Sequence, residues 1–355
     1  MTAEAPRSRA GQLVDELLGF GPHAGAHRVA ARAGLTVLVP LLVLLAADRV
    51  EWSIYAAFGA FTSLYGRERV GPLRLRLQTE VGVLLAGVVV AGVLVGTSEH
   101  RAWLAVPLAA LLAAGAAVLS DRQRWHPPGA LFPVFAFTAC ASIPSEPADA
   151  PVALLVAGAT AAFALLVGNA GAGLRRQWGY AATRPPGEPA IGRSTGLWRH
   201  VAPSALAVLV AGALATGLGI GHPYWAMVSA VVPLAAADPL RQVVRGLHRI
   251  VGTTLGLGLA ALLLAWDPSP LGVVLVVVLL QVLAELLVGR NYAAALVVIT
   301  PLALLMVHLV APTPTATLLL DRGVETLLGV VVGLVVGRAA RRLGTTSAGR
   351  GRMAA

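Results

Sequence analysis

The chain has 355 residues, of which 57% are hydrophobic and only 12% are charged, and its mean hydropathy is +0.77. A soluble globular protein carries roughly 25% charged residues, so this composition excludes a soluble fold and indicates a protein surrounded by lipid. The net charge is +10, yet there is no soluble module to present a basic patch, which excludes a nucleic-acid-binding protein.

Residues 1–27 are predicted to form a cytoplasmic arm. Its apolar residues are spaced for a short amphipathic helix that lies on the inner leaflet: Leu13, Val14, Leu17, Leu18 and Phe20. A cleavable signal peptide is excluded, because the apolar run starts late and no small-residue cleavage site follows a short hydrophobic core.

Twelve apolar stretches follow the arm. Each is continuously apolar rather than alternating, which predicts an all-α transmembrane fold and excludes a β-barrel. Several are shorter than the ~20 residues that a perpendicular helix needs, so flanking polar residues or a thinner bilayer must complete them. We expect spans near residues 33–47, 52–66, 78–96, 102–119, 129–143, 151–170, 201–219, 223–237, 250–265, 270–288, 292–310 and 317–337.

The arginines lie in alternate gaps between these spans. All 27 basic residues are arginine, and only Arg49, Arg101 and Arg322 fall on the side opposite to the rest. By the positive-inside rule, this segregation predicts a multi-pass protein of the plasma (inner) membrane with both termini in the cytoplasm.

The spans form two tandem copies of one unit. The segments from His27 to Trp52 and from His200 to Trp225 each cover 25 residues, and each leads into a short span, an arginine pair and a glycine-rich helix. Six spans per copy put both copies in parallel orientation, related by a pseudo-twofold axis along the membrane normal. We expect a first six-helix repeat over 28–170, a cytoplasmic linker over 171–199, a second repeat over 200–342 and a disordered basic cytoplasmic tail over 343–355.

The sequence lacks the residues of several catalytic chemistries. Without lysine it cannot form the Walker A site of a P-loop ATPase. A single cysteine, Cys140, excludes an internal disulfide and a thiolate metal cage. We therefore expect no enzyme, no cofactor and no metal, so any transport must draw on a gradient or a partner.

Ionised groups inside a bilayer are costly, and this chain has few of them. The densest cluster lies on one helix face of the last span and consists of Asp321, Arg322, Glu325 and Thr326. In one interpretation, Glu325 couples transport to protons or gates an anion pathway, tuned by Arg322. In the other, the charges form a buried ion pair that only fixes helix register.

Other polar residues are also candidates for a substrate or ion pathway. Arg76 and Glu80 open the third span, while Arg249 and Thr253 open the ninth. The two arginines sit at matched places in the two copies and could flank a central anion route. Alternatively, they only cap the cytoplasmic ends of their helices.

A short hairpin that contains Arg290, Asn291 and Tyr292 separates the tenth and eleventh spans. Glu285 lies five residues before Arg290 and could pair with it across the hairpin. Alternatively, Arg290 only keeps this hairpin on the cytoplasmic side, since it is the hairpin's only basic residue.

Aromatic residues form a stripe on one face of the second span: Trp52, Tyr55, Phe58, Phe61 and Tyr65. Such a stripe can stack a planar substrate. It is more often helix packing or an interfacial belt, and both interpretations stay open.

Three stretches resemble the fusaric acid resistance (FUSC) family of membrane proteins: Arg249-x-x-Gly252-Thr253-x-x-Gly256, Arg290-Asn291-Tyr292 and Asp321-Arg322-x-x-Glu325-Thr326-x-x-Gly329. That family is related to the bacterial aromatic acid exporters. The resemblance covers residues 28–342 and implies passage or efflux of organic anions, especially aromatic carboxylates. It also implies the pathway residues to test, which are Arg249, Thr253, Asn291, Tyr292, Arg322 and Glu325.

We therefore expect an integral membrane transporter that exports small organic or aromatic carboxylate anions by secondary transport. Its partners are the lipid bilayer and the anion, and the sequence is compatible with proton coupling and with a homo-oligomer. Two alternatives stay open. One is a non-transporting membrane scaffold or envelope partner protein, and the other, less favoured, is a membrane enzyme that acts on lipid-linked substrates.

Overall fold

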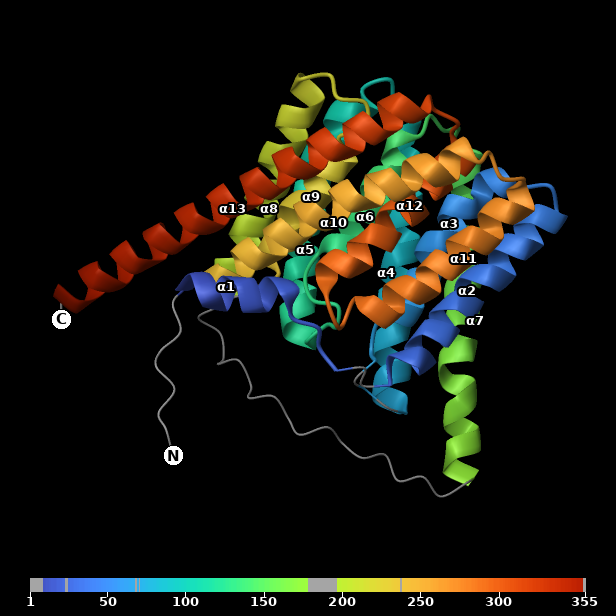
Figure 1. Ribbon diagram of the computed structural model, residues 1–355, viewed down its shortest axis with the longest axis horizontal. Coiled ribbons are helices and arrows are strands. Elements are labelled where there is room, and N and C mark those ends of the chain that lie inside the picture. The colour runs from blue at the N-terminus through green and yellow to red at the C-terminus, as the bar shows by residue number, and fades with distance from the viewer. Residues whose placement is uncertain are drawn as a thin grey trace.

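The computed structural model describes residues 9–22, 25–67, 69, 71–177, 197–236 and 238–353, which form helices and no β-strand (Figure 1). The all-α prediction is confirmed for these residues. The arm and first half contain α1 (Arg9–Leu18), α2 (Ala26–Ala46), the 3-10 turn η1 (Val50–Trp52), α3 (Ser53–Ala60), the 3-10 turn η2 (Phe61–Leu64), α4 (Pro72–Gly96), α5 (Arg101–Gln123), α6 (Leu131–Ser142) and α7 (Asp149–Gln177). The second half contains α8 (Leu197–Gly217), α9 (Tyr224–Leu234), α10 (Pro239–Ala265), α11 (Pro270–Leu287), α12 (Tyr292–Val310) and α13 (Thr315–Met353).

Proline sets where three of these helices begin. Pro72, Pro239 and Pro270 lie in the first turns of α4, α10 and α11, where a missing N–H costs no helical hydrogen bond. At α10 the Asp238 carboxylate also accepts a hydrogen bond from the Arg241 N–H at 3.0 Å. Capping of this kind stabilises a helix start by about 1 kcal/mol, so the sequence marks these starts clearly.

Large apolar side chains cover the outside of the bundle. Val83, Leu111, Leu155 and Leu262 each expose 70% or 71% of their surface. Contiguous exposed apolar surface is unstable in water and ordinary in lipid, so the protein is embedded in a membrane. Among the described residues, seven helices are long and apolar enough to cross it: α2, α4, α5, α7 over Asp149–Ala170, α10, α11 and α12.

Three helices are shorter than the spans predicted for them. α3, α6 and α9 contain 8, 12 and 11 residues. At a rise of 1.5 Å per residue they cover ~12–18 Å, about half of the ~30 Å hydrocarbon core. Proline borders two of these short helices, because Pro144 follows α6 and Pro223 directly precedes α9. The bundle therefore contains half-length helices beside its full-length ones.

Helical structure also extends into two segments that were predicted to be irregular. α7 continues to Gln177, into the 171–199 linker, and α13 continues to Met353. The prediction of a disordered tail over 343–355 therefore differs from the structure as far as residue 353. α13 runs through the sequence Arg-Ala-Ala-Arg-Arg at 338–342, whose residues are strong helix formers and carry the helix onward. Residues 178–196 of the linker lie outside the described residues.

Helices of the two halves pack against one another in four pairs. α2 packs on α11 and α8 packs on α5, while α3 contacts α12 and α9 contacts α6. Within the first half, α4 packs on α6 and α7, and α7 packs on α3. Within the second half, α10 packs on α12 and α13, and α13 packs on α9. One buried apolar cluster runs from α2 to α13 and joins the halves.

The N-terminal arm is fastened to the hairpin between α11 and α12. Asn291 Nδ2 donates to the carbonyls of Leu17 and Gly19 at 3.1 and 3.2 Å, and Arg290 Nε donates to the carbonyl of Gly21 at 3.2 Å. Large apolar side chains beside these contacts stay exposed: Val14, Leu18 and Phe20. α1 is therefore held against the bundle with apolar side chains available to lipid.

Glycine brings α13 into contact with the backbone of α9. A Cβ atom on Gly329 would overlap the Ala226 carbonyl oxygen, and one on Gly333 would overlap the Ala230 carbonyl oxygen. Small residues spaced four apart allow this approach between membrane helices. This close contact holds α13, with Arg322 and Glu325, next to α9.

We predict that Gly329→Ala lowers the thermal stability of the purified protein in detergent, by about 1–3 kcal/mol for overpacking. Gly258→Ala in α10 is the matched control, because nothing lies within 4 Å of the added Cβ. Alanine there gains helix propensity of up to ~1 kcal/mol, so stability should stay level or rise. Equal losses in both variants would rule out the α9–α13 contact as the cause.

Candidate functional site

Three charged side chains are buried together in the second half of the chain. Arg249 of α10, with Arg322 and Glu325 of α13, expose 4%, 1% and 0% of their surface. Both helices pack on α9. An isolated charge at the centre of a bilayer costs roughly 2.5–3.5 kcal/mol or more, so the neighbours of these three groups define the candidate site.

Arg322 lies over the ring of Trp225, the second residue of α9. Its Cζ atom is 3.8 Å from the ring centroid, and a desolvated cation–π contact contributes about 2 kcal/mol. The Nε and Nη1 atoms of Arg322 have no hydrogen-bond acceptor among the described residues, and neither does Nε1 of Trp225. The stacked pair therefore presents buried donors that the protein itself leaves unpaired.

The carboxylates beside Arg322 are held by His222, in the turn that precedes α9. The His222 main-chain N–H donates to Glu325 Oε1 at 3.1 Å, and its ring Nδ1 lies 2.9 Å from Asp321 Oδ2. The second oxygen of Glu325, Oε2, has no donor among the described residues. His222 exposes 15% of its side chain, so it connects the surface with the buried carboxylate.

Arg249 of α10 contacts α9 one helical turn after Trp225, at Ser229. Its Nε and Nη2 atoms donate to Ser229 Oγ and its Nη1 donates to Tyr292 Oη, each at 3.3 Å. The charges of Arg249 and Arg322 repel each other, while Glu325 attracts Arg322. The two arginines therefore occupy successive levels on one face of α9.

Two predicted threonines lie in the same region. Thr253 and Thr326 are almost fully buried, and their hydroxyl groups have no hydrogen-bond partner in the described part of the chain. Buried hydroxyls are usually paired, so these two are further polar groups that a ligand could use.

Glu285 and Asn291 make contacts away from this site. Glu285 forms an ion pair of 3.3 Å with Arg67 of the first half, so the pairing expected with Arg290 is wrong. Arg290 contacts the N-terminal arm instead. Asn291 caps α12 by accepting from the Ala294 N–H at 3.0 Å while its Nδ2 holds the arm. Glu285 therefore links the two halves of the chain, and Asn291 links α12 to the N-terminal arm.

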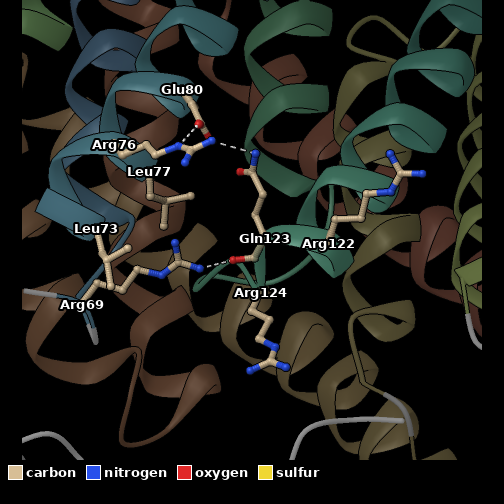
Figure 2. Close-up of a pocket in the computed structure, with 8 residues that line it drawn as sticks. All are labelled: Arg69, Leu73, Arg76, Leu77, Glu80, Arg122, Gln123 and Arg124. Atoms are coloured by element: carbon tan, nitrogen blue, oxygen red, sulfur yellow. Dashed lines mark hydrogen bonds and ion pairs between the residues drawn. The ribbon is translucent and has the colours of Figure 1, made fainter. Parts of the chain in front are cut away.

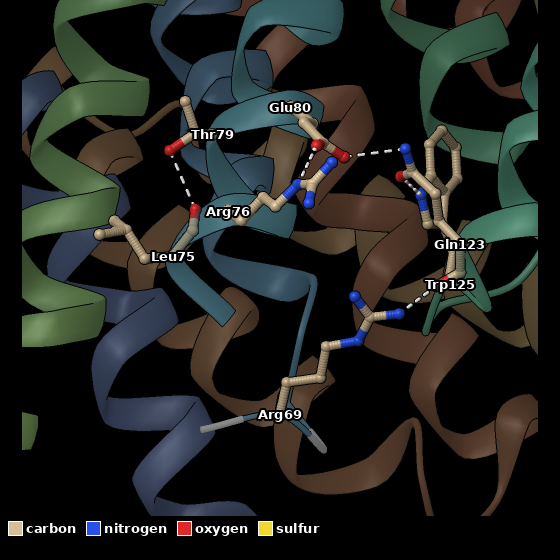
Figure 3. A network of polar contacts seen from close by, with 7 residues as sticks. All are labelled: Arg69, Leu75, Arg76, Thr79, Glu80, Gln123 and Trp125. Atoms are coloured by element: carbon tan, nitrogen blue, oxygen red, sulfur yellow. Dashed lines mark hydrogen bonds and ion pairs between the residues drawn. The ribbon is translucent and has the colours of Figure 1, made fainter. Parts of the chain in front are cut away.

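Arg76 and Glu80 lie at a separate place, between the ends of α4 and α5. Figure 3 shows Arg76 Nε donating to Glu80 Oε1 at 2.8 Å and Gln123 Nε2 donating to Glu80 Oε2 at 2.8 Å. The Arg76 side chain is 81% exposed, whereas Arg249 is buried. Matched positions in the sequence therefore have different surroundings, and the two arginines do not converge.

The aromatic stripe leads toward Trp225. The Phe58 ring lies 5.2 Å from Phe135 of α6, between centroids, and Phe135 lies 5.0 Å from Trp225. A cavity of about 40 Å³ between the two halves is lined by Phe58, Phe61 and Phe135, together with Gln281 of α11. Aromatic surface is thus continuous from this cavity to the ring beneath Arg322.

The other stripe residues have different neighbours. Tyr55 is buried in the core, and the Tyr65 ring lies 5.5 Å from Trp125. Trp52 lies beneath the Arg49 guanidinium, 5.5 Å from its ring centroid, at the end of the predicted span. Of the five residues, only Phe58 and Phe61 border the cavity.

Comparison with known proteins places the buried arginines in a recognised domain. Residues 206–336 match the sequence model of the family described as "Fusaric acid resistance protein-like". This segment is similar to the FUSC family of membrane proteins. The family resemblance is therefore confirmed for this segment, which contains Arg249, Arg322 and Glu325.

One relative of the chain is the "Uncharacterized membrane protein YvaC" of Bacillus subtilis (strain 168), 26% identical over 131 residues. The similarity covers 37% of this chain and 21% of the relative, so the chain spans about a fifth of that protein. No solved structure matches the chain.

Most side chains of the candidate site belong to the three motifs noted in the sequence, but some do not. His222 and Ser229 were not predicted, and Trp225 was noted only as a landmark of the repeat. All three lie on or just before α9, far in sequence from α13. The Asp321–Glu325 spacing was the signal that such partners exist, since two carboxylates on one buried helix face require hydrogen-bond donors from a neighbouring segment.

We predict that Glu285→Gln destabilises the protein by about 3 kcal/mol, because it leaves Arg67 partly buried without its partner. The pair joins the first half of the chain to the second, and its side chains expose 20% and 6%. Glu51→Gln is the control, since the Arg49–Glu51 pair is half exposed and should contribute less than ~1 kcal/mol. Thermal unfolding in detergent measures both, and equal effects would contradict the assignment.

Proposed function

We propose that this protein exports small organic anions, above all aromatic carboxylates, by secondary transport. The observation that carries the proposal is the buried Arg322 guanidinium, which lies over Trp225 and whose Nε and Nη1 atoms have no acceptor among the described residues. An unsatisfied buried donor costs about 1–3 kcal/mol, and more when it is charged. A carboxylate oxygen accepts such hydrogen bonds strongly and would remove that cost.

The aromatic surroundings support an aromatic substrate. A ring attached to the carboxylate would meet Trp225 and then Phe135 and Phe58. The cavity of about 40 Å³ is much smaller than the ~300 Å³ of ordinary ligand pockets, so passage requires the helices around it to move. Residues of α3 and α6 line it, and both are half-length helices of the kind that form central sites in transporters.

Matching helix contacts support two six-helix repeats in parallel orientation. If α2 to α7 correspond in order to α8 to α13, the pairing of α2 with α11 corresponds to that of α8 with α5. The contact of α3 with α12 likewise corresponds to that of α9 with α6. A pseudo-twofold axis along the membrane normal would produce these equivalences and would let the halves rock against each other.

The arginine distribution supports a plasma-membrane protein with cytoplasmic termini and outward transport. All but three arginines lie on the side of the termini. An inside-negative potential of 100 mV drives one negative charge outward with about 2.3 kcal/mol, which is sufficient to power anion export without ATP.

Glu325 supplies a proton-dependent gate in this proposal. A charged Glu325 attracts Arg322 and competes with a substrate carboxylate for it. The His222 ring contacts Asp321, and its main-chain N–H donates to Glu325. Protonation of Glu325 would free Arg322 for the anion.

The first test measures efflux of radiolabelled benzoate from proteoliposomes that contain the purified full chain, with a potassium diffusion potential. We predict that Arg322→Gln lowers the initial rate at least about tenfold, a loss of ~1.4 kcal/mol. Arg338→Gln, an exposed arginine on the same helix, should transport like the wild type. Wild-type flux no greater than that of empty vesicles would contradict transport and favour the scaffold alternative.

The second test follows flux as a function of pH. We predict that wild-type flux rises as the pH falls, because protonation of Glu325 releases Arg322. Glu325→Gln should abolish that dependence while retaining flux, since glutamine is neutral at every pH. Glu51→Gln, which removes an exposed carboxylate, serves as the control. A pH profile unchanged in Glu325→Gln would exclude Glu325 as the gate.

A further inference from the structure

We propose that the cavity between the ends of α4 and α5 binds a phosphate group. The cavity measures about 260 Å³ and lies apart from the α9 site, in the first half of the chain (Figure 2). Its lining consists of Arg69, Leu73, Arg76, Leu77, Glu80, Arg122, Gln123 and Arg124. This inference does not depend on the transport proposal.

Four arginines and one glutamate line this cavity, so its charge is strongly positive. The side chains of Arg122 and Arg124 make no hydrogen bond or ion pair within the described part of the chain, and their guanidinium groups point away from Arg69 and Arg76 (Figure 2). Arg69 and Arg76 each bond through a single nitrogen, Nη2 in Arg69 and Nε in Arg76. Most of the N–H groups around the cavity are therefore free to bind an anion.

The two arginines at the centre are held in place by a chain of hydrogen bonds. Trp125 Nε1 donates to Gln123 Oε1 at 2.7 Å, and Gln123 Nε2 donates to Glu80 Oε2 at 2.8 Å. Glu80 Oε1 in turn accepts from Arg76 Nε at 2.8 Å, and Arg69 Nη2 donates to the main-chain carbonyl of Gln123. Exposed ion pairs are usually loose, so this chain of contacts is what fixes the guanidinium groups.

A phosphate group fits this arrangement better than a single carboxylate does. Its several oxygens can accept from more than one guanidinium at once, which is the recognition that arginine favours. Figure 2 shows Arg69 and Arg76 reaching toward the same space from α4 and the segment before it, with Gln123 opposite. A phosphate there would bridge the two arginines while Glu80 and Gln123 keep them in position.

The phosphate could belong to a lipid headgroup or to a soluble molecule. Leu73 lines the cavity and exposes 67% of its surface, so acyl chains can reach its rim. The cavity also lies at the arginine-rich end of the bundle, where anionic headgroups gather. Both sources present the same chemical group to Arg69 and Arg76.

The test is a binding titration of the purified full chain by native mass spectrometry, with phosphatidylglycerol, phosphatidylcholine and inorganic phosphate as separate probes. We expect the Arg69→Gln/Arg76→Gln variant to bind phosphatidylglycerol at least about tenfold more weakly than the wild type, or ~1.4 kcal/mol. Gln123→Ala keeps all four arginines and the main-chain carbonyl that Arg69 contacts, but removes the amide that holds Glu80 and through it Arg76, so it should weaken binding to a smaller extent.

The control variant is Arg28→Gln/Arg338→Gln, which removes two exposed arginines outside the cavity and changes the net charge equally. A selective loss of phosphatidylglycerol supports a lipid phosphate, and a selective loss of inorganic phosphate alone supports a soluble one. The proposal is overturned if the control loses as much affinity as the Arg69/Arg76 variant. It is equally overturned if no phosphate-bearing probe distinguishes that variant from the wild type.

Discussion

The structure depends on keeping a guanidinium group inside hydrocarbon. Arg322 is 1% exposed and lies over the Trp225 ring beside Glu325, and its own Nε and Nη1 atoms have no acceptor among the described residues. Such a group survives only where backbones approach closely enough to exclude lipid and where opposite charge lies near. Gly329 and Gly333 provide the approach by letting α13 touch the α9 backbone, while His222 positions the carboxylates. Packing and electrostatics are therefore inseparable at this contact.

The two halves of the chain carry different parts of the chemistry. The second half buries Arg249, Arg322 and Glu325 together, whereas the first half contributes aromatic rings and turns Arg76 outward. Under the proposed twofold arrangement, the surroundings of the matched Arg76 and Arg249 have therefore diverged. A pathway between the two halves would be polar on one wall and aromatic on the other, as an amphipathic anion requires.

The sequence predicted what depends on local composition and spacing. Apolar runs gave the helices, and the Asp321–Glu325 spacing identified the buried carboxylates and Arg322 as a cluster. Partners joined across long distances escaped prediction, because helical periodicity says which face is buried but not which helix covers it. His222 lies 103 residues from Glu325, and Arg67 lies 218 residues from Glu285. The short lengths of α6 and α9 were missed because apolar segments beside prolines read as continuous spans, and that of α3 because the apolar 3-10 turn η2 continues its sequence pattern.

The fastening of the N-terminal arm imposes an order on biosynthesis. The Gly21 carbonyl accepts from Arg290, 269 residues later in the chain. At about 5–20 residues per second, the ribosome needs on the order of tens of seconds to make that partner after the arm has emerged. During this interval the arm has no docking place and must remain at the membrane surface or bound elsewhere. Its final attachment can therefore occur only after most of the bundle has been inserted, which makes arm closure a late marker of complete assembly.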